Sequence, residues 1–466
     1  MTTNGKLQIA GLSALSLAGA AGCCDAPKSD DRPNIVLFLI DDLGAEAFGC
    51  MGGVSYDTHN IDSLARQGIL YTNMHAQPLS SPSRVQLMTG LYNDKNYVCF
   101  GYMNDDEPTF AQLAQQAGYT TGMYGKWQLG RDREMPTRLG FDEWCLFQIE
   151  LYKEAAAAMG GVDRYANSIV DYHGHYEYSN YGPDTIEGAA FEFLDKQKDS
   201  DKPFLLYYTT PLVHTPHTPT PDSESWDLDC LGRTKADTSN FPDMVKYMDK
   251  TVGRLVERLK RNGQWDNTLF ILTSDNGTST RIVSQLADGT WRRGGKGEPT
   301  GVGTSVPLII LWGDRLEPRV SERLVDFTDF FPTFADAMRI AVPEEYGLDG
   351  VSLYPEIIGE TPLEKEISVM HFNPLWPTTP SPKAARAART TEYKYYWDGR
   401  FYNTREDFME EHPIDIETCS DEVKAIYAKL KAKVDEVPDF YPDMPGAPRR
   451  GNYGTFYDFA DPNNPF

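Results

Sequence analysis

The chain has 466 residues, and 40% of them are hydrophobic, which is enough for one large α/β domain with an appendage or for several domains. Its formal net charge is −24, which argues against a protein that binds nucleic acid or an anionic membrane as a whole. A local basic pocket for a small anion remains compatible with this charge.

The first residues predict an export signal. Lys6 precedes an apolar run of small residues, 7–21, which is too short to span a bilayer and suits the core of a signal peptide. The letters AAGC that end at Cys23 resemble the lipobox of bacterial lipoproteins. We therefore expect a signal peptide over 1–22 and a tether over 23–32. The expected location is the periplasm or cell envelope, with a lipid anchor at Cys23 as the only membrane contact.

The seven cysteines do not form a metal-binding pattern. Apart from the adjacent Cys23 and Cys24 they lie far apart, and there is no CxxC or Cys/His cluster. This spacing argues against a structural zinc site. The odd number leaves at least one free thiol, and a disulfide among the others stays open.

Apolar runs that indicate buried strands alternate with helical patterns. The strands are expected at residues 34–40, 120–125, 203–208, 268–273 and 306–312. Amphipathic helices that end at a glycine are expected at residues 60–67, 109–118 and 243–263. This alternation predicts an α/β fold with a mostly parallel sheet between two layers of helices.

The pattern changes towards the C-terminus. Residues 390–407 read as a β-hairpin around an Asp-Gly pair, and Ser420 opens an amphipathic helix. We therefore expect an N-terminal catalytic domain over 33–345 and a smaller C-terminal subdomain, an antiparallel sheet with a helix, over 346–466.

Oxygen-bearing side chains follow two of the expected strands, at the edge where open α/β sheets bind ligands. Asp41 and Asp42 follow the first strand, and Asp275 and Asn276 follow the strand at 268–273. Such hard oxygen donors suit Ca²⁺ or Mg²⁺ rather than zinc. Each pair alone is typical of an ordinary turn, so it is their combination at equivalent strand ends that predicts a metal site.

Basic side chains follow the other strands. Lys126 comes at the end of the strand at 120–125, and His214 and His217 follow the strand at 203–208. Lys126 and Lys296 have glycine neighbours, which suggests close approach of the backbone to a ligand. A single lysine or histidine is more often a surface or packing residue, so this prediction depends on the positions occurring together.

The stretch QPLSSPSRVQLMTG, residues 77–90, predicts a short helix with a proline in its first turn. We expect Ser81 to cap this helix and Ser80 to lie just before its N-terminus, where unpaired N–H groups favour an anion. Arg84 adds a fixed positive charge nearby. The stretch therefore predicts a site for a phosphate or sulfate group.

Several ordered motifs resemble those of one enzyme family. SSPSRVQLMTG resembles the signature of the sulfatase family, PNIVLFLIDDLG its N-terminal metal strand, and LTSDNG its second metal block. GMYGKWQLG, PLVHTPHTPTP and RGGKG are similar to the blocks that carry the family's lysine, histidine and distal lysine. The resemblance covers nearly the whole chain after the N-terminal segment.

The resemblance implies an α/β fold of the alkaline-phosphatase type and the hydrolysis of sulfate esters. It implies that one Ca²⁺ is held by Asp41, Asp42, Ser80, Asp275 and Asn276. It implies that Ser80 becomes formylglycine (3-oxoalanine), and a serine at this place implies a radical-SAM sulfatase-maturing enzyme that acts before export. The catalytic residues it implies are Ser80, Arg84, Lys126, His214 and Lys296.

The implied substrate is a sulfated glycan or a small sulfate ester such as an aryl sulfate. The residues expected to contact it are Lys126, His214, Lys296, Gln128, His217 and His371. His214 matches the family spacing better than His217 and is the expected general acid, which makes His217 a residue of the pocket wall. Gln128 stands where the family commonly has a histidine, and a glutamine cannot take up a proton.

Two alternatives stay open. The first is a phosphomonoesterase or phosphodiesterase of the same superfamily, and the second is a non-catalytic glycan-binding relative in which Ser80 is never oxidised. Superfamily phosphatases usually have a second metal and a histidine where this chain has Asn276, which favours one metal and a sulfate ester. The intact Arg84, Lys126 and Lys296 argue against a non-catalytic protein.

Overall fold

The computed structural model describes residues 30–97, 99–130, 133–147, 164–227, 237–374 and 383–439. The predicted signal peptide, the predicted lipid anchor at Cys23 and most of the predicted tether lie outside these residues. In the part of the chain described, no helix is long and apolar enough to cross a membrane, and Cys50, Cys99, Cys145 and Cys419 are free thiols.

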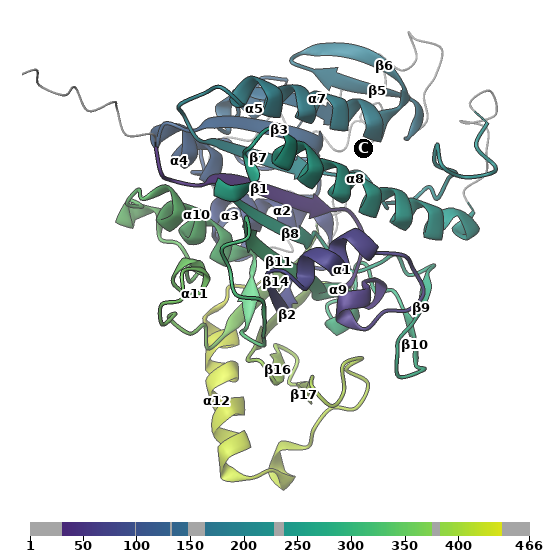
Figure 1. Cartoon of the computed structure of the whole chain (residues 1–466). Coiled ribbons are helices and arrows are strands. Elements are labelled where there is room, and N and C mark those ends of the chain that lie inside the picture. Colours follow the sequence, from purple (N-terminus) through teal and green to yellow (C-terminus); the bar gives the residue numbers. More distant parts are fainter. Residues whose placement is uncertain are drawn as a thin grey trace, which may run out of the picture.

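An 11-stranded sheet forms the centre of the larger domain (Figure 1). In spatial order its strands are β12 (Arg319–Ser321), β2 (Ile69–His75), β11 (Ser305–Trp312), β8 (Thr268–Ser274), β1 (Asn34–Ile40), β7 (Phe204–Thr209), β3 (Thr120–Lys126), β4 (Glu143–Phe147), β5 (Ala166–Tyr172) and β6 (His175–Tyr181), and β13 (Val325–Asp326) pairs with β2.

The central strands β8, β1, β7, β3 and β4 are parallel to one another. The strands on either side, β11 and β5, run antiparallel to their neighbours. The predicted α/β fold with a mostly parallel sheet is therefore confirmed, and each of the five predicted strands is present within a residue of its expected ends.

Helices cover both faces of this sheet, so β1 is buried on both sides. From residue 35 on, its odd-numbered residues pack into one hydrophobic core and its even-numbered residues into the other, which explains the unbroken apolar run IVLFLI. One core contains side chains of α2 (Ser80–Thr89), α4 (Phe110–Gln116) and α10 (Phe330–Met338). The other contains side chains of α1 (His59–Ala65), α7 (Gly182–Gln197) and α8 (Phe241–Arg261).

Shorter helices lie in the connections of the large domain. They are α3 (Asn93–Asn96), α5 (Met135–Arg138), α9 (Gly301–Thr304) and α11 (Tyr354–Ile357). A two-stranded sheet of β9 (Val283–Gln285) and β10 (Trp291–Arg293) lies at the periphery (Figure 1).

The C-terminal part forms a four-stranded antiparallel sheet in the order β14 (Ser368–Phe372), β15 (Ala385–Arg389), β16 (Tyr393–Tyr396) and β17 (Phe401–Asn403). The helix α12 (Asp421–Glu436) packs against it, and the Ser420 side chain caps this helix as predicted. The predicted hairpin is formed by β16 and β17. Leu79, the residue before Ser80, packs against the other face of this small sheet, so the small sheet supports the start of α2.

Candidate active site

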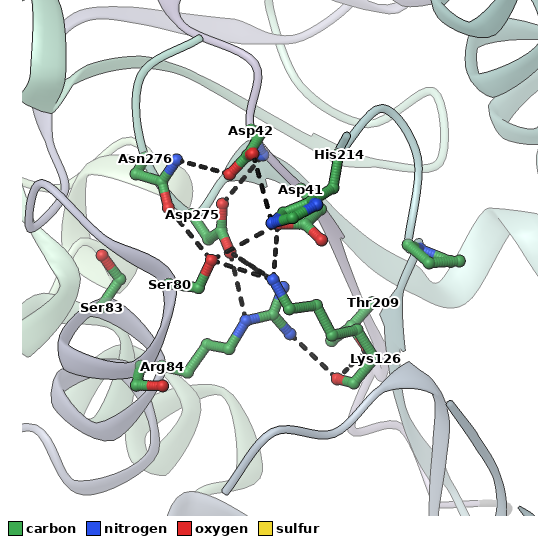
Figure 2. Close-up of polar contacts among 12 residues, drawn as sticks. Asp41, Asp42, Ser80, Ser83, Arg84, Lys126, Thr209, His214, Asp275 and Asn276 are labelled. Carbon is green, nitrogen blue, oxygen red and sulfur yellow. Dashed lines mark hydrogen bonds and ion pairs between the residues drawn. The ribbon is translucent and has the colours of Figure 1, made fainter. Parts of the chain in front are cut away.

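Side chains from the ends of parallel strands meet at one edge of the large sheet (Figure 2). Asp41 and Asp42 follow β1, Asp275 and Asn276 follow β8, and Lys126 is the last residue of β3. The Asp42 N–H donates to Oδ1 of Asp275 at 3.1 Å, and the Asn276 side-chain amide donates to Oδ1 of Asp42 at 2.9 Å. The two predicted pairs of oxygen donors are therefore in direct contact.

The Ser80 hydroxyl lies between these acidic groups and a lysine. Its Oγ is 3.2 Å from Oδ1 of Asn276 and 3.4 Å from Oδ1 of Asp41, and it accepts a hydrogen bond of 2.9 Å from Nζ of Lys126. The Ser80 side chain is almost completely buried. Residue 80 is thus held by groups from three different elements.

The start of the helix that carries Ser80 differs from the prediction. The prediction that Ser81 caps α2 is wrong, because the helix begins at Ser80 and the residue at the cap position is Leu79. The first N–H that donates within the helix belongs to Ser83, which bonds to the Leu79 carbonyl at 3.2 Å. Pro82 therefore lies at a position where no N–H is needed, as predicted for the first turn.

The two serines next to Ser80 have structural contacts instead. The Ser81 hydroxyl accepts the N–H of Gly101 at 2.8 Å, and the Ser83 hydroxyl accepts the N–H of Gln77 at 3.0 Å. These bonds fold the segments before and after α2 onto the helix. Only Ser80 of the three directs its hydroxyl into the cluster of acidic groups.

Arg84 is completely buried one turn along the same helix. Its Nε and Nη2 donate to Oδ2 of Asp275 at 3.2 and 3.0 Å, and its Nη1 donates to the Lys126 carbonyl at 3.0 Å. Burial disfavours the charge of Arg84, but Asp275 and Asp41 outweigh this and raise its pKa. The guanidinium is therefore a permanently charged group with a fixed orientation.

Two lysines neutralise the two aspartates that follow β1. Nζ of Lys126 lies 2.7 Å from Oδ1 of Asp41, and Nζ of Lys296 lies 2.6 Å from Oδ2 of Asp42. Burial of Lys126 lowers its pKa to about 8, although Asp41 opposes this effect. Both lysines that the sequence singled out thus reach the same site from distant parts of the chain.

His214 lies at the rim of the cluster. Its Nε2 is 3.6 Å from Oδ2 of Asp42, and its Nδ1 is 2.6 Å from the Thr215 carbonyl oxygen. Burial, followed by the charges of Arg164, Lys296 and Lys126, lowers the pKa of His214 well below its usual value. The imidazole is therefore neutral at pH 7 in the absence of a bound anion.

The remaining predicted contact residues lie at different places. His217 is buried with its ring packed edge-on against Phe241, at 5.1 Å between ring centroids. Gln128 lies two residues beyond Lys126, and its Oε1 is buried without a hydrogen-bond partner among the described residues. His371 is a buried residue of β14 in the small sheet, in register with Arg386.

The cluster fits a hard divalent cation. Oδ2 of Asp41 is buried and has no hydrogen-bond partner in the described ranges, which is costly unless a ligand satisfies it. Asp41, Asp42 and His214 each offer a ligand atom within 4.8 Å of the others. Asp41, Asp42, Asp275 and Asn276 together offer only oxygen ligands, and such a set suits Ca²⁺. A set in which the imidazole of His214 is a ligand suits Ca²⁺ less well.

The sequence was also compared with models of known protein families. Residues 33–340 match the model of the Sulfatase family. The chain belongs to the sulfatase family. The matched residues contain the large sheet and the whole cluster around Ser80, so the resemblance predicted from the motifs is confirmed.

The relatives of this chain are sulfatases, and some are named as carbohydrate sulfatases. The uncharacterized sulfatase YdeN of Escherichia coli (strain K12) is 29% identical over 401 residues, with 75% of this chain and 69% of that protein covered. N-acetylglucosamine-6-O-sulfatase of Bacteroides thetaiotaomicron is 26% identical over 530 residues, with 92% and 88% covered.

Solved structures share the fold. The crystal structure of Ps i-CgsB in complex with k-i-k-neocarrahexaose is similar with a TM-score of 0.68 and 25% identity, and the match covers 88% of this chain and 95% of that one. Phosphonate monoester hydrolase of Agrobacterium radiobacter is similar with a TM-score of 0.60 and 20% identity, over 87% and 95% of the chains. The predicted fold of the alkaline-phosphatase type is confirmed.

The residue before Lys126 must be a glycine because the backbone of a neighbouring strand lies too close for a Cβ. A Cβ at Gly125 would lie 1.8 Å from the Thr209 carbonyl oxygen of the neighbouring strand β7, and its φ is +120°. Close approach was predicted towards a ligand, whereas the close neighbour at this position is the backbone of β7. The tight contact fixes Lys126 beside Ser80.

We expect Gly125→Ala to lower the free energy of unfolding by at least about 3 kcal/mol, because the new Cβ has no room and φ is positive. Gly118→Ala is the matched control, since its φ is +83° but no atom lies within 4 Å of the added Cβ. It is expected to cost about 1 kcal/mol. Urea unfolding measures both, and equal losses would contradict the steric explanation.

Sequence reasoning missed Arg164. Its guanidinium contacts Nδ1 of His214 and adds positive charge beside the cluster. The arginine stands outside every motif of the family signature, so no local pattern marked it. Only the fold brings it next to a histidine 50 residues away.

Proposed function

We propose that this sulfatase removes sulfate from a sulfated carbohydrate, with a formylglycine made from Ser80 and one Ca²⁺. The observation that carries the proposal is the position of the Ser80 hydroxyl, 2.9 Å from Nζ of Lys126 and within 3.4 Å of the oxygens of Asp41 and Asn276. A side chain held between a lysine and a set of metal-binding oxygens can be kept ionised and aimed at an incoming ester.

The modified residue supplies chemistry that a serine lacks. If Ser80 were converted, the formylglycine hydrate would supply one hydroxyl for attack on sulfur and a second whose deprotonation would release sulfate and restore the aldehyde. Asp41, Asp42, Asp275 and Asn276 would hold Ca²⁺, which would supply positive charge that favours an ionised oxygen at residue 80.

The residues of the chain divide the remaining tasks. Lys126 and Lys296 lie on two sides of the acidic cluster and stabilise the negative charge on the sulfate oxygens. Arg84 is held by Asp275, so it presents a fixed charge beside residue 80. These groups are ordered before substrate binds, so little reorganisation is needed at the moment of reaction.

His214 is the proposed proton donor to the leaving alcohol. Its imidazole lies at the rim of the cluster, where the ester oxygen of a substrate would be. Because burial and the nearby cations hold it neutral in the free site, the negative charge of a bound sulfate ester is what makes protonation favourable. Gln128 has no protonatable group, so it can orient but not accept a proton.

The names of the relatives support a carbohydrate substrate. One relative is an N-acetylglucosamine-6-O-sulfatase, and one similar structure contains an oligosaccharide, k-i-k-neocarrahexaose.

Our proposal also includes export, a lipid anchor at Cys23 and maturation by a radical-SAM enzyme. The N-terminal sequence supports the first two, and the serine at position 80 supports the third.

The test is to co-express the full chain with a radical-SAM maturing enzyme and to measure the mass of the peptide that contains Ser80. We expect a loss of two hydrogens, and release of sulfate from at least one member of a panel of sulfated sugars and aryl sulfates. Turnover of phosphate esters without any turnover of sulfate esters would refute the proposed function.

A further inference from the structure

The hairpin of β9 and β10 has one face that contacts the protein and one that faces solvent. Trp291 pairs with Gln285, Arg292 with Ser284 and Arg293 with Val283. Because successive side chains of a strand point to opposite faces, Trp291 and Arg293 share one face and Arg292 lies on the other. Trp291 is 66% exposed, whereas Ser284 is buried, which agrees with this pattern.

The inner face holds the hairpin in place. The Arg292 guanidinium lies over the ring of Phe408, 4.2 Å from its centroid, and the Ser284 hydroxyl contacts the Tyr56 hydroxyl at 3.4 Å. The loop between the strands is also tied down, since the N–H of Ala287 donates to the Gly52 carbonyl. The outer face is therefore presented on a fixed support.

The base of the hairpin is joined to the catalytic cluster. The Lys296 N–H donates to the Thr278 carbonyl at 2.9 Å, and Thr278 lies two residues after Asn276. The Lys296 side chain contacts Asp42. Three residues of extended chain span at most about 11 Å, so Arg293 lies within that reach of the backbone of Lys296. Only Gly294 and Gly295 separate the hairpin from Lys296 along the chain.

The chemistry of the outer face suits an anionic sugar chain. The outer face carries the exposed side chains of Trp291 and Arg293, in a protein of net charge −24. Arg292 lies on the inner face and Lys296 contacts Asp42, so Arg293 is the basic side chain that β10 offers on its outer face. An indole offers a flat apolar surface for a sugar ring, and a guanidinium binds sulfate oxygens in a paired geometry. Tryptophan and arginine are the residue types that contribute most to binding surfaces.

The outer face of the hairpin leaves Trp291 and Arg293 available to a ligand. Among the described residues, no hydrogen bond, ion pair or ring contact is found for the side chains of Trp291 and Arg293. We propose that the outer face of the β9–β10 hairpin binds the sulfated sugar units that adjoin the ester being cleaved. This inference rests on the proposed function, because it assigns the rest of the substrate to a surface next to the same site.

The first test measures binding without turnover. The purified protein with Ser80→Ala, and the same protein with Trp291→Ala or Arg293→Gln added, are run in native gels that contain carrageenan or chondroitin sulfate. We expect each added substitution to weaken binding about tenfold for at least one polymer, with no binding to the desulfated polymers. Binding unchanged by both substitutions, equal binding to desulfated polymers, or no binding by the parent protein would overturn the inference.

The second test measures turnover by the matured enzyme. Trp291→Ala and Arg293→Gln are expected to raise KM for a sulfated oligosaccharide and to leave kcat/KM for a small aryl sulfate unchanged. An equal loss on both substrates would show that the hairpin acts through the catalytic cluster and would overturn the inference. If no variant and no parent enzyme released sulfate from any substrate, the proposed function would fail while the gel result would still decide the binding question.

Two matched variants control for the loss of an exposed side chain. Trp397 is 48% exposed and lies in the C-terminal part of the chain. Arg261 is exposed at the end of α8. Because α8 leads into the start of β8, Arg261 lies at the opposite end of that strand from Asp275. Trp397→Ala and Arg261→Ala are expected to bind the sulfated polymers like the parent protein. A loss of binding in these controls equal to that of the hairpin variants would also overturn the inference.

Discussion

Replacing Ser80 by alanine is expected to lower kcat for sulfate ester hydrolysis by at least about 10⁴-fold, because the nucleophile is removed while the charged groups around it remain. The fold should persist, since Lys126 keeps its contact of 2.7 Å with Asp41 when the hydroxyl is lost. Sulfate release by the matured protein measures the first effect, and thermal unfolding measures the second.

Ser83→Ala is the matched control on the same helix. The Ser83 hydroxyl accepts the Gln77 N–H at 3.0 Å and donates to the Gln77 carbonyl at 3.1 Å, so its loss leaves a buried N–H unpaired. We expect this variant to lose about 1–3 kcal/mol of stability and to keep most of its activity. An active Ser80→Ala enzyme, or a Ser83→Ala enzyme that is equally inactive yet stably folded, would contradict the assignment of Ser80.

Removing divalent cations is expected to lower activity by about 100-fold or more, because the acidic cluster then lacks the positive charge that favours an ionised oxygen at residue 80. Treatment with a chelator followed by dialysis tests this, and added Ca²⁺ should restore activity. Binding should also be visible without turnover, since a cation that binds only the folded protein raises its melting temperature.

The matched variants for this experiment are Asp41→Asn and Asp266→Asn. Asp41 has the buried oxygen without a partner, so its neutral replacement should abolish the rise in melting temperature caused by Ca²⁺. Asp266 is exposed before the start of β8, at the far end of the sheet, and its replacement should leave that rise unchanged. A melting temperature of the parent protein that does not respond to Ca²⁺ would refute the proposed metal site.

Local sequence patterns were sufficient to predict five strands of the large sheet, β1, β3, β7, β8 and β11, but not its other strands. A parallel strand in the middle of two helical layers is apolar on both faces, and β1 has six consecutive apolar residues, 35–40, and β8 has four, 269–272. The polar residues that follow such strands mark their carboxyl ends. Asp41, Asp42, Asp275 and Asn276 could therefore be placed together before any contact was known.

Helix boundaries were less determined. A proline is tolerated throughout the first turn of a helix, because none of the N–H groups there has a partner within the helix. Pro82 therefore indicated a helix start but not its position, and α2 begins at Ser80 instead of after Ser81. The consequence is that residue 80 belongs to the first turn of the helix and takes its orientation from it.

The sequence by itself determined which side chains end the strands and which chemistry these residues can perform, because each of these depends on neighbours along the chain. Only the tertiary structure decided which of these charged side chains contact one another. Lys126 meets Asp41 across 85 residues, Arg84 meets Asp275 across 191, and Lys296 meets Asp42 across 254. Such contacts depend on the order of strands in the sheet and on the close approach of β3 to β7, which no local pattern encodes.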